Sequence, residues 1–130
     1  MDERQSVLIV DPSEETREVL QTALERRGVR IFSANRAKQG LELARRHHPD
    51  LIVLDLELDD TAEDHCDRFA EQSHVNHTPM VMLGTVRRNK NELPYGEFVA
   101  KPYHYGPLIR RIEELLRCSG ESPPVEGGEG

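Results

Sequence analysis

The sequence predicts an α/β fold, a doubly wound parallel sheet of five strands with helices on both faces. Short apolar runs rich in β-branched residues alternate along the chain with segments whose apolar residues recur at helical spacing. Runs that are apolar throughout are typical of strands buried on both faces. Because parallel strands need crossover connections, this regular alternation favours a parallel sheet.

Five segments have the composition of strands. They cover residues 7–10, 29–32, 51–54, 80–83 and 98–100. In open parallel sheets, ligands bind outside the carboxyl ends of the strands. Four of the expected strands are followed there by polar or small residues, namely Asp11, Asp55, the pair Gly84–Thr85, and Lys101. The topology therefore predicts a site at this edge of the sheet.

Three segments carry an apolar stripe at helical spacing. The first ends near Gly28, which is placed as a C-terminal cap. The second covers about residues 36–47 and stops before Pro49, and the third covers about residues 105–117. Each expected helix follows an expected strand, as the doubly wound arrangement requires.

Composition sets the broad class. The chain has 130 residues and a formal net charge of −7, which argues against direct binding to nucleic acid. No apolar run approaches the roughly 20 residues of a membrane span, and the N-terminus lacks the apolar stretch of a signal peptide, so we expect a cytoplasmic protein. We expect one folded domain over residues 1–118, as a monomer or weak dimer, and a disordered Gly/Pro/Glu-rich tail over residues 119–130.

Two carboxylates and an ammonium group at the strand ends suggest phosphoryl transfer. A carboxylate can act as the nucleophile, and a metal ion and a lysine can neutralise the phosphoryl oxygens. Asp11 also has a purely structural interpretation, as the N-cap of the first helix with Pro12 at the first helical position and Glu14 closing a capping box. Both interpretations of Asp11 stay open from the sequence.

Four blocks of sequence resemble response-regulator receiver domains, the flavodoxin-like modules that histidine kinases phosphorylate on aspartate. They are VLIVD at 7–11, PDLIVLD at 49–55, PMVML at 79–83 and FVAKPY at 98–103, in the order of that family and with similar spacing. The resemblance covers about residues 5–117. It implies the strand order 2-1-3-4-5.

The resemblance also implies roles for individual residues. Asp55 matches the phosphoacceptor, and Lys101 matches the lysine that contacts the phosphoryl group. Asp11 matches the first residue of the acidic pair that organises Mg²⁺, and the backbone carbonyl of Glu57 stands where the family supplies another metal ligand. Phe98 matches the switch aromatic, which changes rotamer on activation. No organic cofactor is implied.

Several positions depart from the family pattern. Pro12 replaces the second acidic residue, so we expect Mg²⁺ to bind through Asp11 and Asp55 but more weakly. Gly84 stands where the family has a Thr or Ser hydroxyl, and Thr85 is the candidate substitute. Residues 85–97 are shorter than the corresponding family segment, which predicts a shortened or missing fourth helix.

Two functions follow from the resemblance and its departures. In the first, Asp55 accepts a phosphoryl group with Mg²⁺ assistance from a histidine kinase or phosphotransfer protein, and the chain then acts on a downstream protein partner. In the second, the chain is a pseudo-receiver that binds a protein partner without phosphorylation. We do not expect an enzyme, because the sequence has no glycine-rich nucleotide loop or nucleophile elbow.

Overall fold

The predicted parallel sheet is confirmed by the computed structural model, which describes residues 4–57, 68–69, 71, 77–85 and 96–120. Five strands pair in the order β2-β1-β3-β4-β5, and every pairing is parallel. The strands are β1 (Ser6–Val10), β2 (Arg30–Ala34), β3 (Leu51–Asp55), β4 (Met80–Gly84) and β5 (Gly96–Ala100). This is the order that the receiver resemblance implied.

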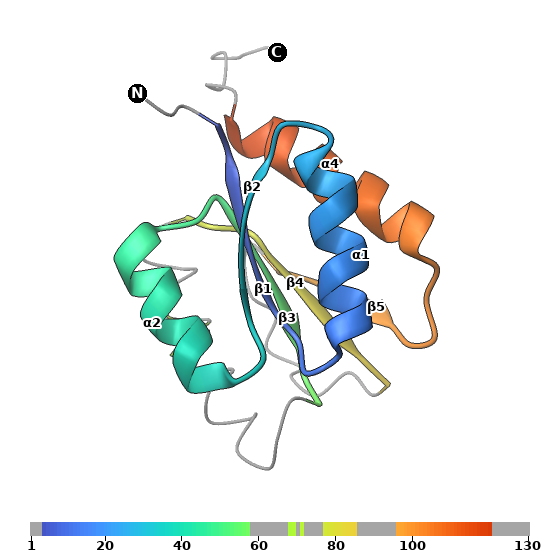
Figure 1. Cartoon of the computed structure of the whole chain (residues 1–130), viewed down its shortest axis with the longest axis horizontal. Coiled ribbons are helices and arrows are strands. Elements are labelled where there is room, and N and C mark those ends of the chain that lie inside the picture. The colour runs from blue at the N-terminus through green and yellow to red at the C-terminus, as the bar shows by residue number, and fades with distance from the viewer. Residues whose placement is uncertain (1–3, 58–67, 70, 72–76, 86–95, 121–130) are drawn as a thin grey trace.

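Helices cover both faces of the sheet (Figure 1). The described helices are α1 (Glu14–Glu25), α2 (Ala37–His47) and α4 (Tyr105–Gly120), and Arg68, Phe69 and Glu71 are also helical. None of them is both long and apolar enough to span a membrane. The predicted end of the last helix at residue 117 was wrong, because α4 continues to Gly120.

Two predictions fall largely on undescribed segments. The shortened or missing fourth helix concerns residues 86–95, which lie outside the described residues. The predicted tail begins inside the last turn of α4, and residues 121–130 also lie outside the described part of the chain. Both expectations stay predictions.

The sheet separates two apolar cores. Helices α1 and α4 pack on one face over a cluster that includes Val7, Ile9, Leu20, Leu24, Leu51, Val53, Val81, Leu83, Leu108, Ile112 and Leu116. On the other face, α2 packs over a cluster that includes Leu8, Val10, Leu41, Ala44, Ile52, Leu54, Phe69 and Met80. Alternate residues of each central strand thus enter opposite cores, which explains why these strands are apolar throughout.

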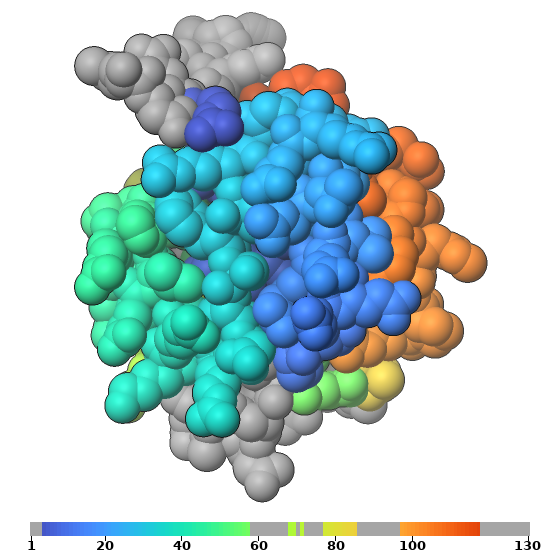
Figure 2. Space-filling view, in the orientation of Figure 1, coloured from blue at the N-terminus to red at the C-terminus, as the bar shows by residue number. Residues whose placement is uncertain are grey.

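Side chains of β2, α1 and α2 close over the strands behind them in the space-filling view (Figure 2). All five residues of β1 are buried accordingly.

The close packing of α2 on β1 depends on Gly40. A Cβ atom at Gly40 would lie 2.7 Å from Val10 Cγ2 and 3.2 Å from Phe69 Cζ, so no larger residue fits without movement.

Gly28, the predicted C-terminal cap, lies just outside the first helix, and the C-cap residue itself is Arg26. Gly28 lies two residues beyond Arg26 and has a φ of +85°, a conformation that glycine adopts without strain. Its N–H donates to the carbonyl of Glu25 at 3.0 Å, and the N–H of Val29 donates to that of Leu24 at 3.0 Å. The chain thereby turns directly into β2.

Candidate functional site

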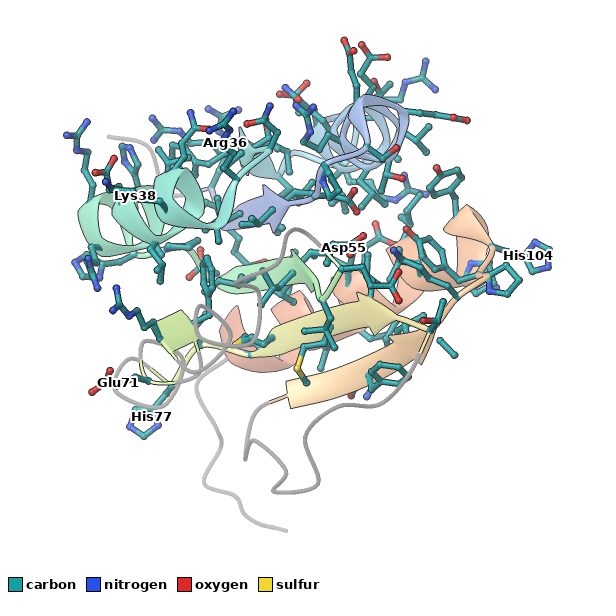
Figure 3. All side chains as sticks on the ribbon, turned by 90° about the horizontal axis from the view of Figure 1, so that it is seen from below. Arg36, Lys38, Asp55, Glu71, His77 and His104 are labelled. Atoms are coloured by element: carbon teal, nitrogen blue, oxygen red, sulfur yellow. The ribbon has the colours of Figure 1, made fainter. Side chains whose placement is uncertain are left out.

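An open cavity of about 570 Å³ lies at the carboxyl ends of β1, β3, β4 and β5. Its lining comprises Asp11, Pro12, Ser13, Thr16, Asp55, Thr85, Lys101, Pro102, Tyr103 and Tyr105. Asp55 lies at the end of β3, in the middle of the sheet (Figure 3). The structure therefore brings the predicted site residues Asp11, Asp55, Thr85 and Lys101 together around one cavity.

Asp11 follows β1, and its side chain faces the site instead of capping a helix. Its backbone N–H donates to Ala34 at 3.0 Å, and its Oδ1 accepts from the N–H of Ser13 at 2.8 Å. The N-cap of α1 is Ser13, whose Oγ accepts from the N–H of Thr16 at 3.2 Å, and the helix begins at Glu14. The structural interpretation of Asp11 and Pro12 as the helix start is therefore wrong, because Ser13 is the residue that satisfies the first turn.

The environment of Asp11 disfavours the ionised form of its carboxyl group. The side chain is almost fully buried, and this burial is the main reason that its pKa rises to about 6. The N–H of Ser13 lowers the pKa, the charge of Asp55 raises it, and Lys101 lowers it by a smaller amount. Two buried carboxylates close enough to interact in this way are a favourable place for a cation.

Asp55 and Lys101 are in direct hydrogen-bonding contact. Lys101 Nζ donates to Asp55 Oδ2 at 2.7 Å, and Asp55 Oδ1 accepts from the N–H of Glu57 at 2.7 Å. Asp55 is 3% exposed, and the Lys101 side chain is 26% exposed. Burial lowers the pKa of Lys101, but its hydrogen bond to Asp55 and the charges of Asp55 and Glu57 outweigh that effect and raise the pKa overall.

The side chain of Glu57 is part of the site, although the sequence prediction included only its backbone carbonyl. Its Oε1 accepts from Lys101 Nζ at 3.2 Å, and its Oε2 accepts from both the N–H of Thr85, at 3.0 Å, and the Thr85 hydroxyl. The hydrogen bonds from Thr85 are the main reason that the pKa of Glu57 falls to about 2, and Lys101 lowers it further. The available signal in the sequence was an acidic residue two positions after Asp55, at the strand edge that also carries Lys101.

Gly84, the last residue of β4, lies beside Phe98 in the middle of the neighbouring strand β5. The backbone N–H of Lys101 donates to the carbonyl of Gly84 at 2.8 Å, which holds β5 against the end of β4. A Cβ at Gly84 would lie 3.6 Å from Phe98 Cε1, so the predicted switch aromatic contacts the position that lacks a hydroxyl. Phe98 itself is half-buried and packs against the α2-side core.

An aromatic wall that the sequence analysis did not single out completes the cavity. The Tyr103 and Tyr105 rings meet edge to face with centroids 5.9 Å apart, and the Tyr105 hydroxyl lies 3.2 Å from Thr16 Oγ1. Burial raises the pKa of Tyr103. Both tyrosines line the cavity where α4 begins.

The donor set at the cavity fits a hard cation. Within the described residues there is no group of three or more His, Cys, Asp and Glu side chains that could hold a metal ion. Two carboxylates, Asp11 and Asp55, line the cavity, and Pro12 adds no ligand. Mg²⁺ is commonly held by one or two carboxylates together with phosphate and water, so this pair and the carbonyl of Glu57 would suit it.

Comparison with known proteins agrees with the geometry. A model of the family described as the response regulator receiver domain matches residues 7–113. The KDP operon transcriptional regulatory protein KdpE of Escherichia coli K12 is 31% identical over 117 residues, which cover 86% of this chain and 51% of KdpE. The transcriptional regulatory protein CseB of Streptomyces coelicolor is 30% identical over 137 residues, which cover 100% of this chain and 57% of CseB. The chain spans about half the length of these curated relatives.

Solved structures share the fold at lower identity. The chemotaxis protein CheY4 of Vibrio cholerae has a TM-score of 0.71 at 20% identity, with 86% of this chain and 98% of that chain covered. The receiver domain of the Francisella response regulator 1452 has a TM-score of 0.73 at 21% identity, with 89% and 99% covered. Since the family model matches most of the chain and the sheet has the strand order expected for that family, this chain belongs to the response regulator receiver domain family.

Proposed function

We propose that Asp55 accepts a phosphoryl group and that the chain is the receiver of a two-component phosphorelay. The observation that carries this proposal is the contact of 2.7 Å between Lys101 Nζ and Asp55 Oδ2 beside the buried carboxylate of Asp11. At this distance the ammonium group of Lys101 forms an ion pair with Asp55. The same group can neutralise negative charge on an incoming phosphoryl group. Family membership supports the same role.

The chemistry is a phosphoryl transfer between two acceptors. One carboxylate oxygen of Asp55 attacks phosphorus, and the bond from phosphorus to the donor breaks with its electron pair staying on the donor. The donor is a phosphorylated histidine of a kinase or phosphotransfer protein, or a small acyl phosphate. Lys101 stabilises the phosphoryl oxygens, and Mg²⁺ would supply further charge neutralisation when it is held by Asp11 and Asp55.

This role makes the chain a phosphoacceptor that passes a signal to a protein partner, and not an enzyme. The net charge of −7 supports a protein partner over direct contact with nucleic acid. Curated relatives are transcriptional regulators about twice as long, so in a longer protein, DNA contact would come from residues outside this chain. Family membership also supports a cytoplasmic location.

Incubation with Mg²⁺ and acetyl phosphate, followed by intact mass spectrometry, tests the proposal. We expect one phosphoryl adduct on the native chain and none on Asp55→Asn, which keeps the shape of the side chain but removes the nucleophilic carboxylate. Asp50→Asn is a matched control, because Asp50 sits at the opposite end of β3, where its Oδ2 accepts from the N–H of Ser6 at 2.8 Å. An unmodified native chain at saturating donor would reject the proposal.

A pseudo-receiver is the second candidate, and two positions favour it. Pro12 stands where the family has a second acidic residue, so one acidic ligand is missing. Gly84, at the end of β4, stands where the family has a Thr or Ser hydroxyl. In this alternative the same fold binds its partner without phosphorylation. Partner affinity would then be equal for the native chain, the acetyl phosphate-treated chain and Asp55→Asn, whereas a change on treatment that Asp55→Asn abolishes would exclude it.

A further inference from the structure

One carboxylate at the site is bound by groups that a phosphoryl group on Asp55 would also need. Glu57 accepts hydrogen bonds from Lys101 Nζ at 3.2 Å and from the backbone N–H of Thr85 at 3.0 Å, and it also accepts from the Thr85 hydroxyl. Lys101 directly follows β5, and Thr85 directly follows β4. The Glu57 side chain therefore joins three strand ends through a single anionic group.

We propose that Glu57 is an internal substitute for the phosphoryl group, an anion that ties Thr85 to Lys101 until phosphoryl transfer displaces it. We call these three residues the Glu57 clasp. This inference rests on the proposed function, since displacement matters only if Asp55 is phosphorylated. It makes Glu57 a positioning residue that acts through Thr85 and Lys101.

The proton inventory of the clasp shows why displacement is required. A threonine hydroxyl and a backbone N–H each carry one proton, and Glu57 accepts both of those offered by Thr85. Thr85, the candidate substitute for the missing hydroxyl at Gly84, has therefore no proton left to donate to a phosphoryl oxygen. Lys101 has three protons, of which Asp55 and Glu57 take two.

The contacts of Glu57 in the clasp are weak enough to be displaced. The Glu57 side chain is 40% exposed and Lys101 is 26% exposed, so their ion pair is screened by water and contributes little on its own. A phosphoryl group carries more negative charge than a carboxylate and would compete successfully for the same donors. Before phosphoryl transfer, Glu57 holds Thr85, the residue after β4, close to the end of β3.

Labelling rates of Asp55 with acetyl phosphate and Mg²⁺ test the clasp. We expect Glu57→Ala to be labelled about two- to fivefold faster than the native chain, the size of effect expected for removal of an exposed ion pair. Thr85→Val should slow labelling of Glu57→Ala more than labelling of the native chain, because the hydroxyl is free to serve the phosphoryl group only once Glu57 is removed. Glu42→Gln removes an exposed negative charge in the middle of α2 and should leave the rate unchanged.

These variants separate the clasp from two simpler accounts. If Glu57 only repels an anionic donor, Thr85→Val changes the labelling rate of neither the native chain nor Glu57→Ala. If the Thr85 hydroxyl already serves the phosphoryl group in the native chain, Thr85→Val slows both proteins by the same factor. Either result overturns the proposal, as does an equal or slower rate in Glu57→Ala.

A second measurement needs no phosphoryl transfer. In the absence of donor, hydrogen exchange of the Thr85 amide should be about fivefold or more faster in Glu57→Ala than in the native chain and in Glu42→Gln. If no variant is labelled but this difference is present, the phosphoacceptor function fails and the clasp stands as a structural contact. Equal Thr85 exchange in all three proteins would overturn the clasp whether or not Asp55 is labelled.

Discussion

Asp11 and Asp55 hold their carboxyl groups at the ends of two neighbouring strands, buried to 1% and 3% exposure. Burial, followed by the charge of Asp55, raises the pKa of Asp11 to about 6, despite the hydrogen bond that Asp11 accepts from Ser13. A site with this charge arrangement holds excess free energy in the folded protein when no cation is present. Stability should therefore depend on pH in a defined direction.

Unfolding of the metal-free chain measures that dependence. The ordinary pKa of Asp11 is 3.8 and the folded value is about 6, so between these values the folded state binds more protons than the unfolded state. The contribution of Asp11 to the free energy of unfolding consequently falls as pH rises from about 4 to about 6 and stays lower above that range. Asp11→Asn cannot ionise, so at about pH 7.5 with chelator present it should be more stable than the native chain by about 1–3 kcal/mol in urea unfolding.

The same variant provides its own control at low pH. Near pH 4 both proteins carry a neutral group at position 11, and their stabilities should converge. Glu42→Gln on the exposed face of α2 should show no comparable stabilisation at either pH. A constant difference between Asp11→Asn and the native chain over the whole range would contradict the raised pKa.

Packing of α2 on β1 gives a prediction about stability alone. Gly40→Ala places a Cβ 2.7 Å from Val10 Cγ2, and Val10 is fully buried and β-branched, so it cannot rotate away. We expect a loss of about 1–3 kcal/mol, despite the better helix propensity of alanine. Gly106→Ala in α4 is the matched control, because its Cβ would meet only Arg110 Nη1 at 3.9 Å. Urea unfolding should find Gly106→Ala neutral or more stable by up to about 1 kcal/mol.

The sequence carried the fold and the position of the site because both depend on local patterns. Strands that are apolar throughout require cover on both faces, and their carboxyl ends then bring Asp11, Asp55 and Lys101 together. One error came from competition between neighbouring side chains. Ser13 and Asp11 are both good N-cap residues, and only the backbone path shows that Ser13 is used.

The contacts of the Glu57 side chain could not be predicted from the sequence. A glutamate in a loop after a strand has three rotatable side-chain bonds, and nothing in the sequence fixes its direction. Its contacts with Thr85 and Lys101 depend on the spacing of three strand ends across the sheet. The end of α4 was missed for a different reason, because Ser119 and Gly120 carry no apolar pattern that would mark them as helical.

Restoring the second acidic residue should strengthen metal binding. Pro12 is exposed at the rim of the cavity beside Asp11, where an aspartate would add a third carboxylate to the donor set. We expect Pro12→Asp to bind Mg²⁺ on the order of tenfold more tightly by isothermal titration calorimetry, since affinity rises with the charge count of the ligands. Pro12→Asn loses the proline ring without adding charge and should stay near the native affinity. Equal affinities for the two variants would place the metal away from this rim.

The missing hydroxyl at Gly84 can be restored without a clash. A Cβ there would lie 3.4 Å from Leu56 Cβ and 3.6 Å from Phe98 Cε1, both ordinary van der Waals contacts. Gly84→Ser should therefore fold and offer the phosphoryl group a donor that does not depend on Thr85. Since loss of one such donor costs enzymes roughly 10²–10³ in rate, we expect acetyl phosphate to label Asp55 faster by on the order of tenfold or more. Gly84→Ala adds the same Cβ without the hydroxyl, so the gain belongs to the hydrogen bond only if this control keeps the native rate.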